Sequence, residues 1–315
     1  MTQPIRIAAA VAAALVILLA FAQPNGGAPP AYAAKRTPAP TATPVPPQPA
    51  PPGMRAGLRA SNYGITPFPS PAWWTSSINS MAGNWPGSAG EQVAVVVEVA
   101  GGGGRNNCWA HFPQPGTGTY PNVNWDDVDL FESTFTAFDN AGIKVWLQVE
   151  PASCSVPMLI DLLYQQYGDH PSVIGFGVDV EWFRKDISRT GKAVTDAEAQ
   201  AWATQVRSKN AAHLLFLKHW LIEKMPPTYR TGLVFIDDSQ GHGSLAAMVS
   251  EFSAWGQAFS PSPVGFQYGY QSDAAWWKSM PDPPANIGNA LLQAIPNTRD
   301  LVWVDFTAYD IWPPE

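Results

Sequence analysis

The sequence predicts an α/β fold, a (β/α)8 TIM-type barrel with one irregular or missing strand. Along residues 54–315, short apolar strand patterns alternate with longer helical patterns, as in proteins that join parallel strands through crossover helices. This stretch is long enough for one large domain, and no second linker interrupts it. Several predicted strands end in acidic or amide residues. In such a barrel, reacting groups gather at the carboxyl ends of the strands.

The individual elements follow from local composition and periodicity. Strands are predicted over residues 58–63, 93–99, 143–150, 173–181, 231–237, 264–270 and 301–306. Helices are predicted over residues 128–141, 156–167, 196–223, 244–255 and 286–294. Because only seven strands are visible, an eighth is expected between residues 271 and 295, or the barrel is incomplete. A doubly wound open sheet is the second choice.

The N-terminal region predicts export. Arg6 precedes an uncharged apolar run over residues 7–22, and an A-x-A pattern ends at Ala33, so residues 1–34 are predicted to be a signal peptide. The alternative is an uncleaved anchor. Residues 35–53 are rich in proline and predict an extended linker. We therefore expect a secreted or extracellular protein, or one tethered to the cell surface by its N-terminal segment.

Composition narrows the classes of partner. The chain has 18 basic and 25 acidic residues, a net charge of −7 and no basic run, which argues against nucleic acid or an anionic membrane surface. We expect no membrane partner beyond the N-terminal anchor. The 14 tryptophans include candidate platforms for sugar rings, although most are expected in the core. A monomer with a carbohydrate substrate is the prediction.

The chain has two cysteines, Cys108 and Cys154. In an exported protein they are predicted to form a disulfide that joins two neighbouring loops. Neither C-x-x-C nor H-x-x-x-H spacing occurs, and His213 and His219 cannot share a metal from one predicted helix. No metal and no cofactor are expected.

The most informative segment is the strand that ends in Asp179, Val180 and Glu181. Side chains alternate along a strand, so Asp179 and Glu181 are expected on one face. Two carboxylates at the end of an apolar strand indicate proton-transfer chemistry or polar recognition.

The same alternation predicts a polar ring inside the barrel. Its members are Glu98, Trp146, Gln148, Glu150, Asp179, Glu181, Asp237, Gln267, Trp303 and Asp305. A barrel built for stability alone would be filled with branched aliphatic residues, so this ring indicates a ligand site. The structural alternative is a buried ion network in which Lys144 pairs with Glu150 or Asp179.

The segment Phe176-Gly177-Val178-Asp179-Val180-Glu181-Trp182-Phe183 resembles the fourth-strand signature D-G-x-D-x-D-x-E of family 18 glycoside hydrolases, the chitinases and endo-β-N-acetylglucosaminidases. Asp179 and Glu181 match its second and third acidic positions, whereas Phe176 and Phe183 replace the first aspartate and the catalytic glutamate. Residues 266–270 resemble the sixth-strand M-x-Y segment, and Trp303 resembles the last-strand tryptophan. The resemblance implies a sugar-active barrel, but not the substrate-assisted mechanism.

Paired-carboxylate glycoside hydrolysis needs a protonated acid and a second carboxylate. We predict Glu181 as the acid, because Phe176, Trp182 and Phe183 would give it apolar surroundings that raise its pKa. Glu150 is the first candidate partner and Asp305 the alternative. Asp179 would orient or tune Glu181.

The remaining ring residues and one tyrosine are predicted to bind the substrate: Trp146, Gln148, Asp237, Gln267, Tyr270, Trp303 and Glu98. The competing hypothesis is a non-catalytic carbohydrate-binding barrel, which the replacement of the family glutamate by Phe183 favours. The density of inward acids disfavours it.

Overall fold

The computed structural model describes residues 53–85, 91–100 and 106–314, without the side chains of residues 91, 92 and 97–100. The predicted signal peptide and all of the predicted linker except Gly53 lie outside these ranges. Among the residues described, no helix is both long and apolar enough to cross a bilayer.

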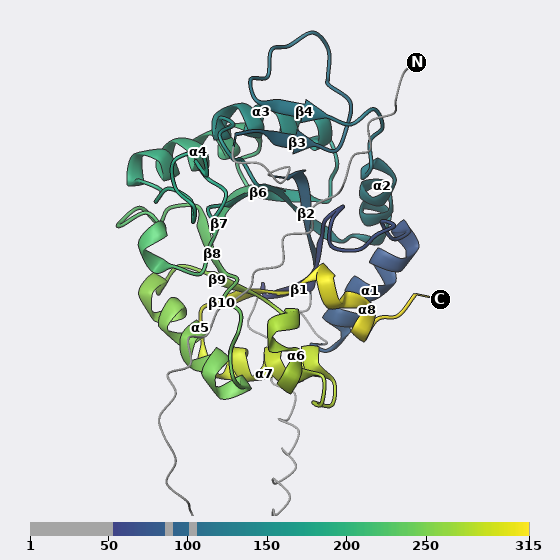
Figure 1. Ribbon diagram of the computed structural model, residues 1–315, viewed down its shortest axis with the longest axis vertical. Coiled ribbons are helices and arrows are strands. Elements are labelled where there is room, and N and C mark those ends of the chain that lie inside the picture. Colours follow the sequence, from purple (N-terminus) through teal and green to yellow (C-terminus); the bar gives the residue numbers. More distant parts are fainter. Residues whose placement is uncertain (1–52, 86–90, 101–105, 315) are drawn as a thin grey trace, which may run out of the picture. The chain divides into compact units, whose positions relative to one another are not determined.

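Eight parallel strands close into a barrel, which confirms the predicted fold class (Figure 1). In chain order they are β1 (Arg55–Ala60), β2 (Glu91–Ala100), β5 (Lys144–Val149), β6 (Val173–Asp179), β7 (Leu214–Lys218), β8 (Leu233–Asp237), β9 (Val264–Tyr268) and β10 (Thr298–Trp303). The barrel closes because β1 pairs with both β10 and β2. Two short strands, β3 (Cys108–Ala110) and β4 (Val123–Trp125), extend the sheet beyond β2.

Helices surround the barrel (Figure 1). They are α1 (Pro71–Gly83), α2 (Glu132–Ala141), α3 (Val156–Tyr167), α4 (Asp196–Lys209), α5 (Leu245–Phe259), α6 (Ala274–Trp277), α7 (Pro283–Ala294) and α8 (Ala308–Ile311). Short 3-10 turns occur at η1 (Ile222–Lys224), η2 (Gln271–Asp273) and η3 (Asp305–Thr307). The helix starts are encoded locally: Ser70, Ser155 and Ser244 each cap a helix through the side chain.

The eighth strand is β7, so its expected position between residues 271 and 295 was wrong. That region forms η2, α6 and α7. The predicted helix over residues 196–223 instead ends at Lys209, and the chain then turns into the apolar run that forms β7. Asn210 has extended backbone angles at this boundary. Because a short buried strand is apolar on both faces, its pattern merges with that of a preceding helix.

Two apolar cores hold the barrel. The larger lies between the strands and the helices. The smaller fills the barrel interior with Val93, Val95, Trp146, Phe216, Val234, Ile236 and Val302. Phe216 fits there because β6 carries glycine beside it: a Cβ on Gly177 would lie 2.0 Å from the Phe216 ring. This layer closes the interior beneath the carboxyl ends of the strands.

The predicted disulfide is present between Cys108, at the start of β3, and Cys154, in the loop between β5 and α3. The Cα atoms of these cysteines are 6.4 Å apart, and 46 positions separate them in the sequence. The cross-link thus ties the β3–β4 extension to the loop that follows Glu150.

Candidate active site

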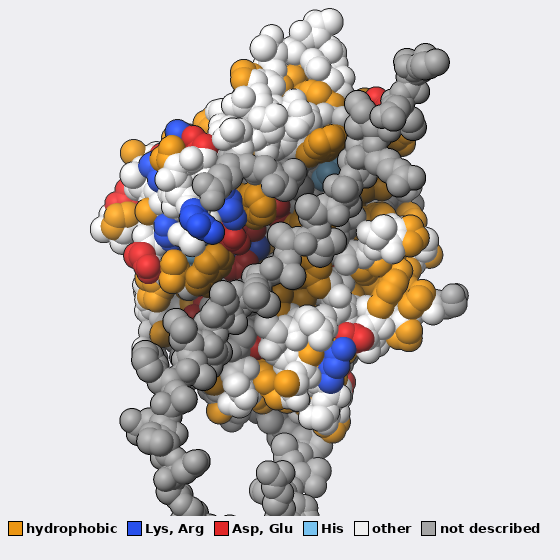
Figure 2. All heavy atoms as spheres, in the orientation of Figure 1, with side chains coloured by type: hydrophobic (Ala, Val, Ile, Leu, Met, Phe, Trp, Pro, Cys, Tyr) orange, Lys and Arg blue, Asp and Glu red, His pale blue; other side chains and the backbone are white. Residues whose placement is uncertain are grey.

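The polar residues of the barrel lie at its mouth, where the strands end. Figure 2 shows acidic and basic side chains at the bottom of a hollow in the middle of this face. The side chains that meet there come from different elements: Arg59 from β1, Glu150 after β5, Asp179 from β6, Lys218 from β7, Asp238 after β8 and Gln267 from β9. All six are buried.

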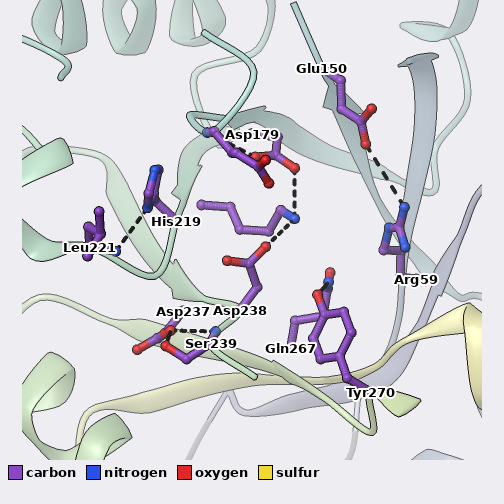
Figure 3. Close-up of polar contacts among 12 residues, drawn as sticks. Arg59, Glu150, Asp179, His219, Leu221, Asp237, Asp238, Ser239, Gln267 and Tyr270 are labelled. Carbon is purple, nitrogen blue, oxygen red and sulfur yellow. Dashed lines mark hydrogen bonds and ion pairs between the residues drawn. The ribbon is translucent and has the colours of Figure 1, made fainter. Parts of the chain in front are cut away.

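Lys218 joins two carboxylates across the mouth (Figure 3). Its Nζ lies 2.8 Å from Asp179 Oδ2 and 2.7 Å from Asp238 Oδ2. Burial alone would lower the pKa of Lys218, but the two carboxylates outweigh burial and raise it well above its usual value. A buried ion network is therefore present, and its cation is Lys218 rather than Lys144.

Asp179 holds a proton more tightly than an ordinary aspartate. Burial raises the pKa of the Asp179 carboxyl to about 7, against the opposing effect of Lys218. The negative charges of Asp238, Glu150 and Glu181 also raise it. Near neutral pH this carboxyl can exist in both protonation states, as a proton donor requires.

Glu150 is surrounded by hydrogen-bond donors. The Tyr63 hydroxyl donates to Glu150 Oε1. Arg59 Nη2 lies 4.0 Å from the same oxygen, as Figure 3 shows. Arg59 in turn donates from Nη1 to Asp305 Oδ1 over 2.7 Å. These contacts fix the position of the Glu150 carboxyl group at the mouth.

Glu150 and Asp179 lie side by side in the register of the barrel. Val149 of β5 pairs with Val178 of β6, so these two acids are the next residues along neighbouring strands. Adjacent strands are about 4.8 Å apart. This spacing brings the Asp179 carboxyl, whose pKa is about 7, next to a carboxyl that accepts a hydrogen bond from Tyr63.

Glu181 lies at the rim, and its predicted apolar surroundings were wrong. Its Oε1 lies 2.7 Å from Lys185 Nζ, and its side chain is 31% exposed. Phe183 points away from the mouth and packs against Trp202 of α4, with ring centroids 5.1 Å apart. Phe176 belongs to the outer core. Burial raises the pKa of the neighbouring Asp179, whose Oδ1 accepts a hydrogen bond from the Glu181 backbone N–H.

The inward orientation predicted for Asp237 was also wrong. Its register partner Phe266 belongs to the outer core, and Asp237 lies behind the barrel wall. There the Ser239 hydroxyl lies 2.6 Å from Asp237 Oδ1 and 2.9 Å from Glu251 Oε1 of α5. The next residue, Asp238, takes the inward position and pairs with Lys218. Leu233–Ile236 are apolar on both faces, so the sequence does not indicate which positions of this strand point inward.

Neither predicted tryptophan platform is available for stacking on a sugar. Trp303 is fully buried in the outer core, where its Nε1 donates to Thr307 Oγ1 over 3.1 Å. Trp146 does face the barrel interior, but it is enclosed between Phe216 and Arg55, whose guanidinium carbon lies 5.0 Å from the ring centroid.

Three more predicted binding residues face the mouth. Gln148 lies one inward position below Glu150 and is fully buried. Gln267 donates from Nε2 to the Tyr270 hydroxyl (Figure 3). Burial and the nearby Asp238 raise the pKa of Tyr270. Glu98 belongs to β2, but its side chain lies outside the described part of the structure.

Asp305 is buried and its oxygens are occupied. Besides Arg59, the Ser61 backbone N–H donates to Asp305 Oδ2 over 2.7 Å and the Ser61 hydroxyl donates to it over 2.6 Å. The carboxylate therefore fixes the guanidinium of Arg59 and the turn after β1.

Arg59, Tyr63, Lys218 and Asp238 were not predicted from the sequence. Lys218 is the one charge in an apolar strand, and Arg59 is one of two arginines in β1; charged residues within such strands are a signal for buried ion pairs. Asp238 would have been predicted to face the mouth if the inward and outward positions of its strand had been assigned the other way round. Within the described ranges, no group of three or more His, Cys, Asp or Glu side chains is arranged to hold a metal ion.

The closed sheet of eight parallel strands defines the chain as a TIM-type (β/α)8-barrel protein. No protein-family model matches it, and no curated protein matches it. The resemblance to family 18 therefore remains limited to three short motifs.

Among solved structures, similar chains are β-glucuronidases, which belong to a different family from family 18. An FMN-binding β-glucuronidase from Faecalibacterium prausnitzii L2-6 has 12% identity and a TM-score of 0.47, over 80% of this chain and 37% of that one. A β-glucuronidase of an uncultured Clostridium sp. has 11% identity and a TM-score of 0.47, over 80% and 44%. The chain thus spans less than half the length of these enzymes.

Proposed function

We propose that this protein is a glycoside hydrolase in which Glu150 and Asp179 are the catalytic carboxyl groups. The observation that carries the proposal is their position on neighbouring strands, where Asp179 has a pKa of about 7 and Glu150 accepts a hydrogen bond from Tyr63. Glycoside hydrolysis needs two carboxyl groups, one that donates a proton and one that attacks the sugar or activates water.

The roles follow from the two environments. Asp179 protonates the leaving oxygen, and Glu150 attacks the anomeric carbon or activates water. Strands about 4.8 Å apart favour the carboxyl spacing of roughly 5 Å found in retaining enzymes. Glu181, the acid predicted from the sequence, is the competing proton donor, because its side chain is more exposed than that of Asp179.

Single substitutions test these roles. Glycans and aryl glycosides of both anomeric configurations are incubated with the full-length protein, and reducing ends are measured. Glu150→Gln and Asp179→Asn should each lower kcat by about 10²–10⁴-fold without loss of the fold. Asp169→Asn changes an exposed acid before β6, at the opposite end of the barrel, and should have no effect. Loss of activity in Glu181→Gln but not in Asp179→Asn would transfer the acid role to Glu181.

A non-catalytic carbohydrate-binding barrel is the second candidate. Its support is the ion pairing of Asp179 and Asp238 with Lys218, since paired carboxylates also serve as fixed hydrogen-bond acceptors. Measuring glycan binding beside cleavage separates the two functions: binding to the wild-type protein without release of reducing ends would favour this candidate.

We also propose that the protein works outside the cytoplasm. The Cys108–Cys154 disulfide supports this, because such bonds persist in oxidising compartments. N-terminal sequencing of the protein from the culture medium and from the cell envelope would distinguish a cleaved signal peptide from a retained anchor.

A further inference from the structure

The mouth contains buried polar atoms without partners. Within the described ranges, neither side-chain atom of Gln148 has a hydrogen-bond partner, and the same holds for Asp238 Oδ1 and Arg59 Nε. Gln148 is 0% exposed and Asp238 is 7% exposed. Because unsatisfied buried polar groups are costly, atoms of this kind are normally paired with water or a ligand.

These atoms share one location. Gln148 lies directly below Glu150 on the inward face of β5, opposite Gly177 of β6. Asp238 lies on the other side of Lys218 from Asp179. They therefore form the floor beneath the two proposed catalytic carboxyl groups, which is where the reacting sugar would lie.

The floor suits a group with hydroxyls. The amide of Gln148 offers one acceptor and one donor group, and Asp238 Oδ1 offers an acceptor. A sugar hydroxyl both donates and accepts, so it can satisfy each of these atoms. A carboxylate only accepts and would meet the Asp238 oxygen as a like charge.

The charges at the mouth also disfavour an acidic sugar. Both buried cations are already paired: Lys218 with Asp179 and Asp238, and Arg59 with Asp305 and Glu150. Four carboxyl groups thus surround two cations. The described part of the mouth has an excess of negative charge and offers no unpaired buried cation to an acidic sugar.

We propose that the sugar bound at this floor is uncharged or carries an ammonium group, and that sugars with a carboxylate, such as uronic acids, are excluded. This inference rests on the proposed function and specifies its substrate class. Asp238 is the residue that sets the selectivity, because it supplies both a free acceptor and the charge that occupies Lys218.

Matched substrates provide the test. Aryl glucosides, glucosaminides and glucuronides, with galactosides and galacturonides as a second series, are compared in both anomeric forms for cleavage by kcat/KM and for binding by calorimetry. The uncharged or amino sugar should be preferred over its uronic acid counterpart by about tenfold or more in kcat/KM and in affinity. This factor corresponds to the repulsion between the sugar carboxylate and the Asp238 carboxylate in contact.

Asp238→Asn sharpens the test. Removal of this charge also leaves Lys218 without one of its two carboxylate partners, so that it can pair with a sugar carboxylate. The preference against the uronic acid should therefore fall by about tenfold. The control Glu223→Gln removes an exposed acid of η1 and should leave the preference unchanged. If Asp238→Asn does not fold, the preference of the wild-type protein still decides the proposal.

The outcomes are distinguishable. Equal or better use of the uronic acid sugars overturns this inference and leaves the hydrolase proposal intact. Selective binding of uncharged or amino sugars without cleavage supports the inference and overturns the hydrolase proposal. A panel that is neither bound nor cleaved overturns both.

Discussion

Asp237 and Asp238 are consecutive residues whose carboxyl groups lie on opposite sides of the barrel wall. Asp238 faces the mouth, 2.7 Å from Lys218 Nζ, whereas Asp237 lies behind the wall, where the Ser239 hydroxyl contacts both Asp237 Oδ1 and Glu251 Oε1 of α5. Strand alternation at the end of β8 produces this division. One pair of neighbouring residues thus contributes to the site and to the contact between barrel and helix.

The Asp237–Glu251 pair should make stability depend on pH. Burial, and then the charge of Glu251, raise the pKa of Asp237 well above its ordinary value, and burial raises the pKa of Glu251. The folded state therefore binds more protons than the unfolded state above about pH 4. This stabilisation is complete below the unfolded pKa values and is lost as pH rises through the folded ones.

Glu251→Gln tests that dependence by urea unfolding between pH 5 and 9. Glutamine does not titrate and places no charge beside Asp237, so the loss of stability with rising pH should become shallower, by up to about 1.4 kcal/mol per pH unit for one proton. Glu223→Gln, which changes an exposed acid, is the control. Parallel wild-type and Glu251→Gln curves would contradict the prediction.

Lys218→Met should destabilise the fold by about 3–5 kcal/mol, because it leaves two buried carboxylates without their cation. The loss should be smaller at pH 5 than at pH 8, since protonation removes the unpaired charges. Chemical unfolding at both pH values measures it.

The surface pair of Lys278 and Asp310 supplies the comparison. These side chains are 45% and 42% exposed, so Lys278→Met should cost less than about 1 kcal/mol. Similar losses in the two lysine variants would show that burial of Lys218 has little energetic weight.

The pKa of Asp179 should set the alkaline limb of the profile of kcat/KM against pH. If its protonated form is the acid, kcat/KM should fall as pH rises through about 7. Asp238 raises the pKa of Asp179, so Asp238→Asn should move this limb to lower pH. Asp169→Asn should leave it in place, and a limb that stays fixed in Asp238→Asn would argue against Asp179 as the titrating group.

Replacing Cys108 and Cys154 with serine should lower the free energy of unfolding by about 4 kcal/mol, as chain entropy predicts for a loop of 46 residues. Thermal unfolding of the double variant, compared with wild-type protein before and after reduction, measures the effect. A double variant as stable as the oxidised wild type would contradict the prediction.

The sequence was informative where a strand had one polar and one apolar face. Lys144, Trp146, Gln148 and Glu150 could be assigned to one face of β5 because Val145, Leu147 and Val149 marked the other. No such contrast exists in β8, and the error over Asp237 followed from that. Tertiary pairings such as Lys218 with Asp238 depend on barrel closure, which no local pattern encodes.

The Cys108–Cys154 bond determines how the protein should be produced for assays. The loop that it fastens starts at Pro151, immediately after Glu150, so material made in a reducing cytosol would carry a looser attachment next to a proposed catalytic group. Secretion into an oxidising medium, or refolding with a thiol–disulfide couple, is therefore the preparation in which assays for activity are meaningful.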